Sequence, residues 1–302
     1  MNRILSLTAT ILLIFSSIFS CRQIEPGEII PETTFSTYMA DSAKTDSLIE
    51  KREIFYGLLT PVEITEIFSR LETAYHIDML NPVENAENYL SASKAALNLG
   101  IYGVDLSYLK MFDLNAEMLH YLTAVRKLSG RLNIPMEYLT DPLDNIENNM
   151  ADTDSVLSLA NNAYKRIEDH LEQHDRKSTA GLMVLGGWIE ALYISTELLL
   201  DTENPDPEVV QRIAEQKYTL NTLLSFLKNY YDDPIVVYYT KKLKFLKKYF
   251  DNFDIYFKED DLEIDHVKQV LRASGSDLTI TTQTLRNIKE YAKKMREETV
   301  SL

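Results

Sequence analysis

The chain has 302 residues, of which 45% are hydrophobic, and it carries 46 acidic against 31 basic side chains, a formal net charge of -15. This length allows one large domain or two smaller ones with a core that needs no disulfides, and a single cysteine excludes a disulfide within the chain. An acidic surface repels phosphate backbones, so nucleic acid is not an expected partner.

The first residues have the layout of an export signal. Arg3 precedes an apolar run, Ile4 to Phe19, of about 16 residues, which is short for a bilayer core that needs roughly 20. Ser20 and the only cysteine, Cys21, follow this run. The pattern predicts a secretory signal peptide over residues 1–20 rather than a spanning helix.

The quartet Ile18-Phe19-Ser20-Cys21 resembles the lipobox of bacterial lipoprotein precursors. The resemblance implies that residues 1–20 are removed and that Cys21 is lipidated, palmitate included. It also implies an exported protein facing the periplasm or the cell surface, with the outer membrane as the expected site. More than one acyl chain gives stable attachment, so the membrane is the expected partner of Cys21. An ordinary secretory signal or an uncleaved anchor helix is the alternative.

Residues 21–46 are expected to form the lipidated cysteine and a flexible tether. This stretch contains Pro, Gly and many Ser and Thr residues, and its apolar residues do not recur at helical spacing. About 25 residues of flexible chain span roughly 25–30 Å, enough to hold a folded body clear of the head groups. Residues 47–302 are expected to form the helical domain. The acids and proline of 201–206 mark a candidate boundary inside it.

The first half of this domain contains a series of expected helices. They are indicated by apolar residues at helical spacing and by prolines at the expected first turns. Between two of them, Gly100 and Gly103 predict a tight turn within 100–112. The expected helices are 47–59, 61–74, one that begins at Asn81, 114–130 and 154–172.

The stretch 179–200 stands apart because its only charges are Glu190 and Glu197. A helix that is apolar on nearly all sides is either central and buried or spans a membrane. The cost of a carboxylate in the middle of a bilayer favours burial. Further helices are expected over 207–231, 234–257 and 285–295, whereas 258–278 predicts a short helix or a small hairpin.

These elements predict an all-α fold, a multi-helix bundle of about eight or nine helices. Short connections favour antiparallel neighbours. A solenoid of degenerate helical hairpins is the alternative, although no fixed repeat recurs in the sequence.

A carboxylate at Glu190, within an apolar helix, must be hydrogen-bonded, paired or protonated. One interpretation is a pair with a lysine or tyrosine of a neighbouring helix. The other is a ligand-binding cleft for a glycan or a peptide, lined by Trp188, Glu190 and Tyr193.

Lys241, Lys244 and Lys248 belong to the one basic cluster of this acidic sequence, on the helix face opposite an apolar stripe. A solvated helix face is one interpretation. A docking patch for an acidic partner is the other, since complementary charge selects partners.

Three histidine pairs have the spacing of metal ligands on a helix, the last two as in di-iron carboxylate bundles. They are His170 with His174, Glu117 with His120, and Glu263 with His266. Such matches arise by chance in a chain with five histidines and 46 acids. No metal site, cofactor or catalytic residue is therefore assigned.

The sequence thus predicts a lipid-anchored, exported helical protein, a non-enzymatic binding or scaffold component of the cell envelope with an envelope protein as partner. A glycan- or peptide-binding lipoprotein is the second hypothesis. A metalloenzyme built on a helical bundle is the third.

Overall fold

The computed structural model describes residues 35–38, 51–58, 76–138, 153–199, 205 and 207–302. All of them belong to one compact unit, Thr33–Leu302. Cys21 and the signal segment lie outside the described residues, as do residues 201–204 and 206, where an internal boundary is expected.

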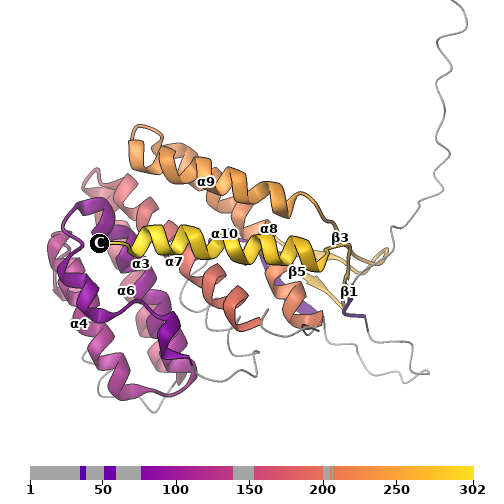
Figure 1. Ribbon diagram of the computed structural model, residues 1–302, viewed down its shortest axis with the longest axis horizontal. Helices are drawn as coiled ribbons and strands as arrows, with labels where there is room; N and C mark the ends of the chain where they lie inside the picture. Colours follow the sequence, from indigo (N-terminus) through magenta and orange to yellow (C-terminus); the bar gives the residue numbers. More distant parts are fainter. Residues whose placement is uncertain (1–34, 39–50, 59–75, 139–152, 200–204, 206) are drawn as a thin grey trace, which may run out of the picture. The chain divides into compact units, whose positions relative to one another are not determined.

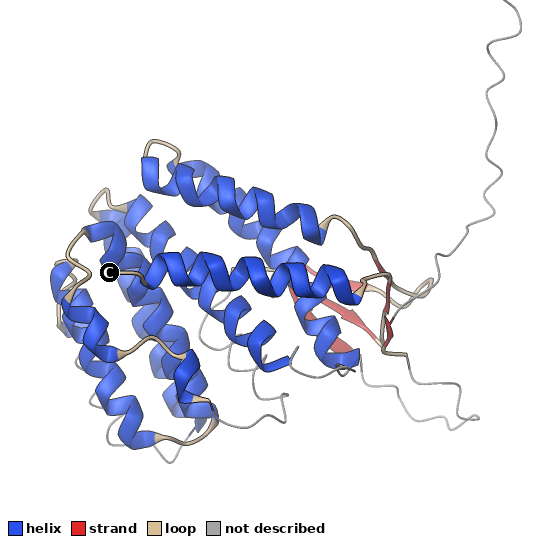
Figure 2. Cartoon of the chain, viewed as in Figure 1, coloured by secondary structure: helices blue, strands red, loops and turns tan. Residues whose placement is uncertain are grey.

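Helices make up most of the described chain (Figures 1 and 2), so the helical part of the fold prediction is confirmed. In chain order the α-helices are α3 (Ala92–Met111), α4 (Asn115–Arg131), α6 (Thr153–Gln173), α7 (Lys177–Leu199), α8 (Pro207–Leu227), α9 (Pro234–Phe250) and α10 (Thr282–Val300). The 3₁₀-helices are η2 (Ile77–Met79), η3 (Val83–Glu87) and η4 (Lys228–Tyr230). The strands are β1 (Phe35–Ser36), β2 (Arg52–Phe55), β3 (Ile255–Tyr256), β4 (Glu263–Asp265), β5 (Val270–Ala273) and β6 (Asp277–Leu278).

Helix α7 lies at the centre of the core. Every residue from Ala180 to Thr196 is buried, and α3, α6, α8 and α10 all pack against the helix. The expected central burial is therefore confirmed. Within the described ranges, no helix combines the length and the apolar character that a membrane span needs.

Close contact between α3 and α7 depends on glycine. A Cβ atom at Gly100 would overlap the carbonyl oxygen of Met183, and one at Gly186 would overlap that of Leu97. The tight turn expected within 100–112 is therefore wrong. Helix α3 continues without a break past both of its glycines to Met111. Gly100 allows the backbones of α3 and α7 to come close together and does not form a turn.

The periodic stripes of α9 and α10 face the core as expected. The helix expected over 234–257, however, ends at Phe250, and strand β3 follows it. Phe250 in α9 and Leu285, Ile288 and Met295 in α10 are all buried. Side-chain caps start both helices, at Asp233 for α9 and at Thr281 for α10. Figure 1 shows α9 and α10 as neighbours, and the two helices are in contact.

Two small sheets correct the all-α prediction. β1, β6 and β3 form one three-stranded antiparallel sheet, and β2, β5 and β4 form another. The strands are drawn in red beside the blue helices in Figure 2. The stretch 258–278, expected as a short helix or hairpin, supplies three of them. Each sheet joins a strand from near the start of the chain to strands from near its end.

The helix expected over 47–59 is wrong for the described residues there, because Arg52–Phe55 is strand β2. Ile54 is fully buried, and the Glu53 carboxylate pairs with Arg272 of β5 at 2.6 Å. The folded unit also includes part of the expected tether, since Phe35–Ser36 pairs with β6. Long-range pairing decided the conformation of both segments.

Candidate functional site

The buried stripe of α9 determines which of its side chains lie on the solvent-exposed side of the helix. Asp233 accepts a hydrogen bond from the backbone N of Ile235 at 2.8 Å and caps the helix. The buried hydrophobic side chains are Val236, Tyr239, Leu243, Leu246 and Phe250. Away from this stripe, Lys241, Lys244 and Lys248 are exposed, so their expected placement on one open face is confirmed.

Large apolar side chains are exposed beside these lysines. Each is between 37% and 45% exposed: Tyr231, Ile235, Tyr238 and Phe245. Three of the four lie on α9 itself, and Tyr231 directly follows η4. These four residues, with Lys241, Lys244 and Lys248, are termed the α9 face below.

Contacts between rings and ammonium groups organise the α9 face. The Lys244 Nζ lies 5.6 Å from the ring centroid of Tyr231, and the Lys248 Nζ lies 5.3 Å from that of Phe245. Phe245 stacks on Tyr291 of α10 with ring centroids 5.0 Å apart and planes at 28°. The exposed rings are thus held in place by neighbours on both helices.

The lysines of this helix differ in their ion pairs. Lys242 pairs with Glu298 of α10 at 2.7 Å, and Lys247 pairs with Asp251. Within the described part of the chain, no carboxylate forms an ion pair with Lys241, Lys244 or Lys248. The charge of the α9 face is therefore not neutralised by the described residues.

A second polar cluster lies inside the core, around Glu190 of α7. The fully buried Glu190 carboxylate pairs with Arg296 of α10, whose Nε lies 3.0 Å from Oε2 and whose Nη2 lies 3.2 Å from Oε1. The same Nη2 donates a hydrogen bond to the carbonyl oxygen of Met79 at 3.0 Å. The guanidinium also lies over the ring of Tyr193, at 4.9 Å. Burial alone would lower the pKa of Arg296, but the Glu190 carboxylate raises it overall.

A second carboxyl group, Asp105 of α3, lies against this pair. Burial raises the pKa of Asp105 well above its usual range, and the charge of Glu190 raises it further. Burial also raises the pKa of Glu190, while Arg296 opposes that rise. Asp105 Oδ2 accepts from the backbone N of Asn81 at 3.3 Å, and Oδ1 has no donor. Burial and the neighbouring Glu190 carboxylate thus favour the protonated form of Asp105.

The remaining groups of the cluster bind the end of α10. Asn98 Nδ2 donates to the carbonyl oxygen of Thr299 at 3.3 Å, and the Tyr89 hydroxyl donates to that of Val300 at 2.9 Å. Carbonyl oxygens at a helix C-terminus have no partner within the helix. The cluster thus joins α3, α7 and α10 and satisfies the last turn of α10.

The residues of the expected ligand cleft lie in the core. Trp188 and Tyr193 are buried, and the Trp188 Nε1 donates to the Thr219 hydroxyl at 2.9 Å. Three cavities lie elsewhere: one at Glu84 and Glu117, one at Glu84 and Lys127, and one at the start of α8. Neither Glu190 nor the two aromatic side chains line any of them. Glu190 has a partner, as expected, but the partner is an arginine rather than a lysine or tyrosine. The cleft stays a prediction, and the three side chains expected to line it are buried.

The chain matches no protein-family model, no curated protein and no solved structure. The choice of a candidate site therefore rests on geometry. The α9 face is exposed, aromatic and positively charged, whereas the Glu190 cluster is enclosed and has its own partners. The α9 face is the better candidate for contact with another molecule.

The three pairs that contain a histidine lie in three separate parts of the chain. The rings of His170 and His174 are 4.1 Å apart between centroids. His120 is exposed on α4, and the Tyr56 hydroxyl lies 3.1 Å from His266 Nδ1. Glu263 is in strand β4, so the helical spacing assumed for that pair is wrong. In the ranges that the structure describes, no three His, Cys, Asp or Glu side chains gather as a metal site would require.

Proposed function

We propose that the protein is a non-enzymatic binding or scaffold component of the cell envelope that docks an acidic protein partner on the α9 face. In this proposal a lipid on Cys21 holds the exported chain on a membrane. The observation that carries the docking step is the combination of exposed aromatic rings with unneutralised lysines. It occurs in a chain whose acids outnumber its bases by 46 to 31.

The two kinds of side chain supply different parts of an interface. Aromatic side chains give a large contact area and are common at the energetically important positions of interfaces. Lysines attract an acidic surface, speed the encounter and fix its orientation. Because Phe245 is already stacked on Tyr291, little ordering of that ring is needed on binding.

The proposal includes the finer arrangement of the fold, a bundle in which consecutive helices run antiparallel. Short connections support it, because residues 112–114 join α3 to α4 and residues 174–176 join α6 to α7. A solenoid of helical hairpins is the alternative arrangement.

The test is photo-crosslinking of the full-length, lipidated chain in its native membrane. A photoreactive residue replaces Tyr238 on the α9 face, and in a matched protein it replaces the exposed Val267, which lies between β4 and β5. We expect one stoichiometric protein adduct from position 238 and none from position 267. The Cys21→Ala form is expected to lose the adduct, because it lacks the lipid anchor.

Charge reversal then tests the role of the lysines. K241E/K244E/K248E is expected to abolish the adduct at position 238. K165E/K177E/K268E reverses three exposed lysines elsewhere, with the same change of net charge, and is expected to keep it. An adduct that survives the first set, or that both sets abolish equally, contradicts docking on the α9 face.

A further inference from the structure

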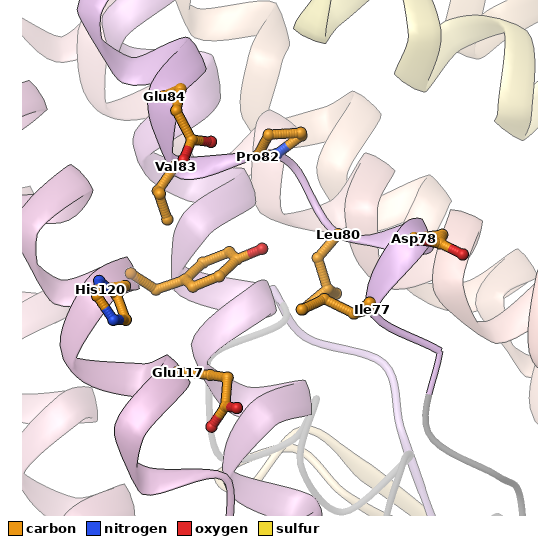
Figure 3. A pocket seen from close by; sticks show the side chains of 9 residues that line it. Ile77, Asp78, Leu80, Pro82, Val83, Glu84, Glu117 and His120 are labelled. Carbon is orange, nitrogen blue, oxygen red and sulfur yellow. The ribbon is translucent and has the colours of Figure 1, made fainter.

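A hollow of about 590 Å³ lies between the segment of η2 and η3 on one side and α4 on the other. Figure 3 shows Ile77 and Leu80 on one side of it and Glu117 and His120 on the other. The ring of Tyr121 also lines the hollow. Ile77 is half exposed at 50%, so the site offers apolar surface that is open to solvent.

Three carboxylates surround this apolar surface: Asp78, Glu84 and Glu117. Asp78 and Glu84 are exposed and Glu117 is half-buried. No described residue forms an ion pair or a hydrogen bond with any of the three side chains, and no lysine or arginine is among the residues that line the hollow. The negative charge of the hollow is therefore available to a ligand.

A second hollow of about 330 Å³ continues along η3 and α4. Val83 and Glu84 line both hollows, so the two lie next to each other, and together they are termed the groove below. In the second hollow the Glu87 carboxylate pairs with Lys127. The free charge of the groove is thus concentrated in the first hollow, at Asp78, Glu84 and Glu117.

From this geometry we infer that the groove binds a basic, extended segment of a partner protein. A lysine or arginine side chain of that segment enters the first hollow. Its methylene groups lie along Leu80 and Tyr121, as such stems do on apolar surfaces, and its cationic head contacts one of the carboxylates. This site is separate from the α9 face and takes a partner of opposite charge.

The spacing of the carboxylates favours a peptide over a metal ion. Among the described residues, no three acidic or histidine side chains lie close enough together to hold one ion. Carboxylates spread along a groove can each contact a different group of an extended chain. The three carboxylates would repel an anionic ligand.

The test measures binding of a fluorescein-labelled octapeptide of alternating lysine and alanine to the full-length protein. The readout is fluorescence anisotropy at about 150 mM salt, where long-range attraction is screened. Two variants are compared. D78N/E84Q/E117Q removes the groove charges, and E259Q/D260N/E290Q removes three exposed carboxylates elsewhere with the same change of net charge.

We expect saturable binding that the groove variant weakens by at least about tenfold and the control variant by less than about twofold, since hydrogen bonds to charged groups are the strong ones. Arginine amide is expected to compete only at far higher concentration. The inference is overturned if the unaltered protein shows no saturable binding or if both variants weaken it equally. It is also overturned if arginine amide competes as well as the unlabelled peptide, which would indicate a site for small amines.

Discussion

Replacing Arg296 by methionine removes the only cation that pairs with the fully buried Glu190 among the described residues. Methionine fills much of the space of the arginine stem but leaves the carboxylate beside Asp105 without its partner. Removing one member of a buried ion pair costs about 3–5 kcal/mol. The total free energy of unfolding of a domain is about 5–15 kcal/mol, so roughly a fifth or more of the stability should be lost.

Urea unfolding followed by far-ultraviolet circular dichroism measures this loss. The matched control is Lys247→Met, which breaks a half-exposed ion pair on α9 and should cost less than about 1 kcal/mol. A double variant, Glu190→Leu with Arg296→Met, should lose less than Arg296→Met alone, because no unpaired charge is left behind.

The pH dependence of the Arg296→Met variant provides a second measurement. Without the guanidinium, burial keeps the folded-state pKa of Glu190 above its unfolded value. A carboxyl group with a raised folded-state pKa loses stability as the pH rises through the interval between the two values. The deficit of the variant should therefore grow as the pH rises above the ordinary range of a glutamate. A loss below about 1 kcal/mol that does not change with pH would refute the reasoning.

Three further outcomes are expected. Gly186→Ala should destabilise the protein by about 1–3 kcal/mol or more, because its Cβ overlaps the Leu97 carbonyl; urea unfolding measures it, and an unchanged stability would contradict the α3–α7 contact. Asp105→Asn should flatten the fall in stability with rising pH, since the folded-state pKa of Asp105 is raised; an unchanged pH profile would mean that Asp105 is ionised. Ile54→Ala should cost about 2–5 kcal/mol, whereas Val267→Ala, at a 95% exposed site, should cost almost nothing; equal losses would contradict the β2 assignment.

The helices that the sequence predicted best are those with a long, one-sided or continuous apolar pattern. The run 179–200 became the buried α7, and the stripe through Phe250 became the inward side of α9. A pattern that extends over four or five turns outweighs local irregularities. The same pattern placed Lys241 and its neighbours outward correctly.

The strands could not be predicted in the same way. β2 has four residues and β1 only two, too few for a period of two to be recognised. Both segments are strands because they pair with residues more than 200 positions later. Nothing in the local sequence identifies those partners. The turn predicted at Gly100 was wrong for a related reason. The role of Gly100 depends on the position of α7, which the local sequence does not show.

The partner of Glu190 shows what a sequence can and cannot indicate about a buried charge. The position of Glu190 in an apolar helix correctly demanded a partner. Arg296, however, lies in a helix with many exposed charges, where one buried arginine has no distinguishing mark. Asp105 carried a usable signal, because it is the only acid in the apolar stretch 95–109.

The pairing of β1 with β6 and of β2 with β5 also constrains the order of folding. A ribosome releases the N-terminus of the chain first. The segments of β1 and β2 therefore appear long before the residues with which they pair. Loops of more than 200 residues must close before either sheet forms, which is slow because their closure entropy comes first. Until then the edges of β1 and β2 are unpaired and open to wrong partners. A chain that stops after α9 would leave both strands permanently in that state.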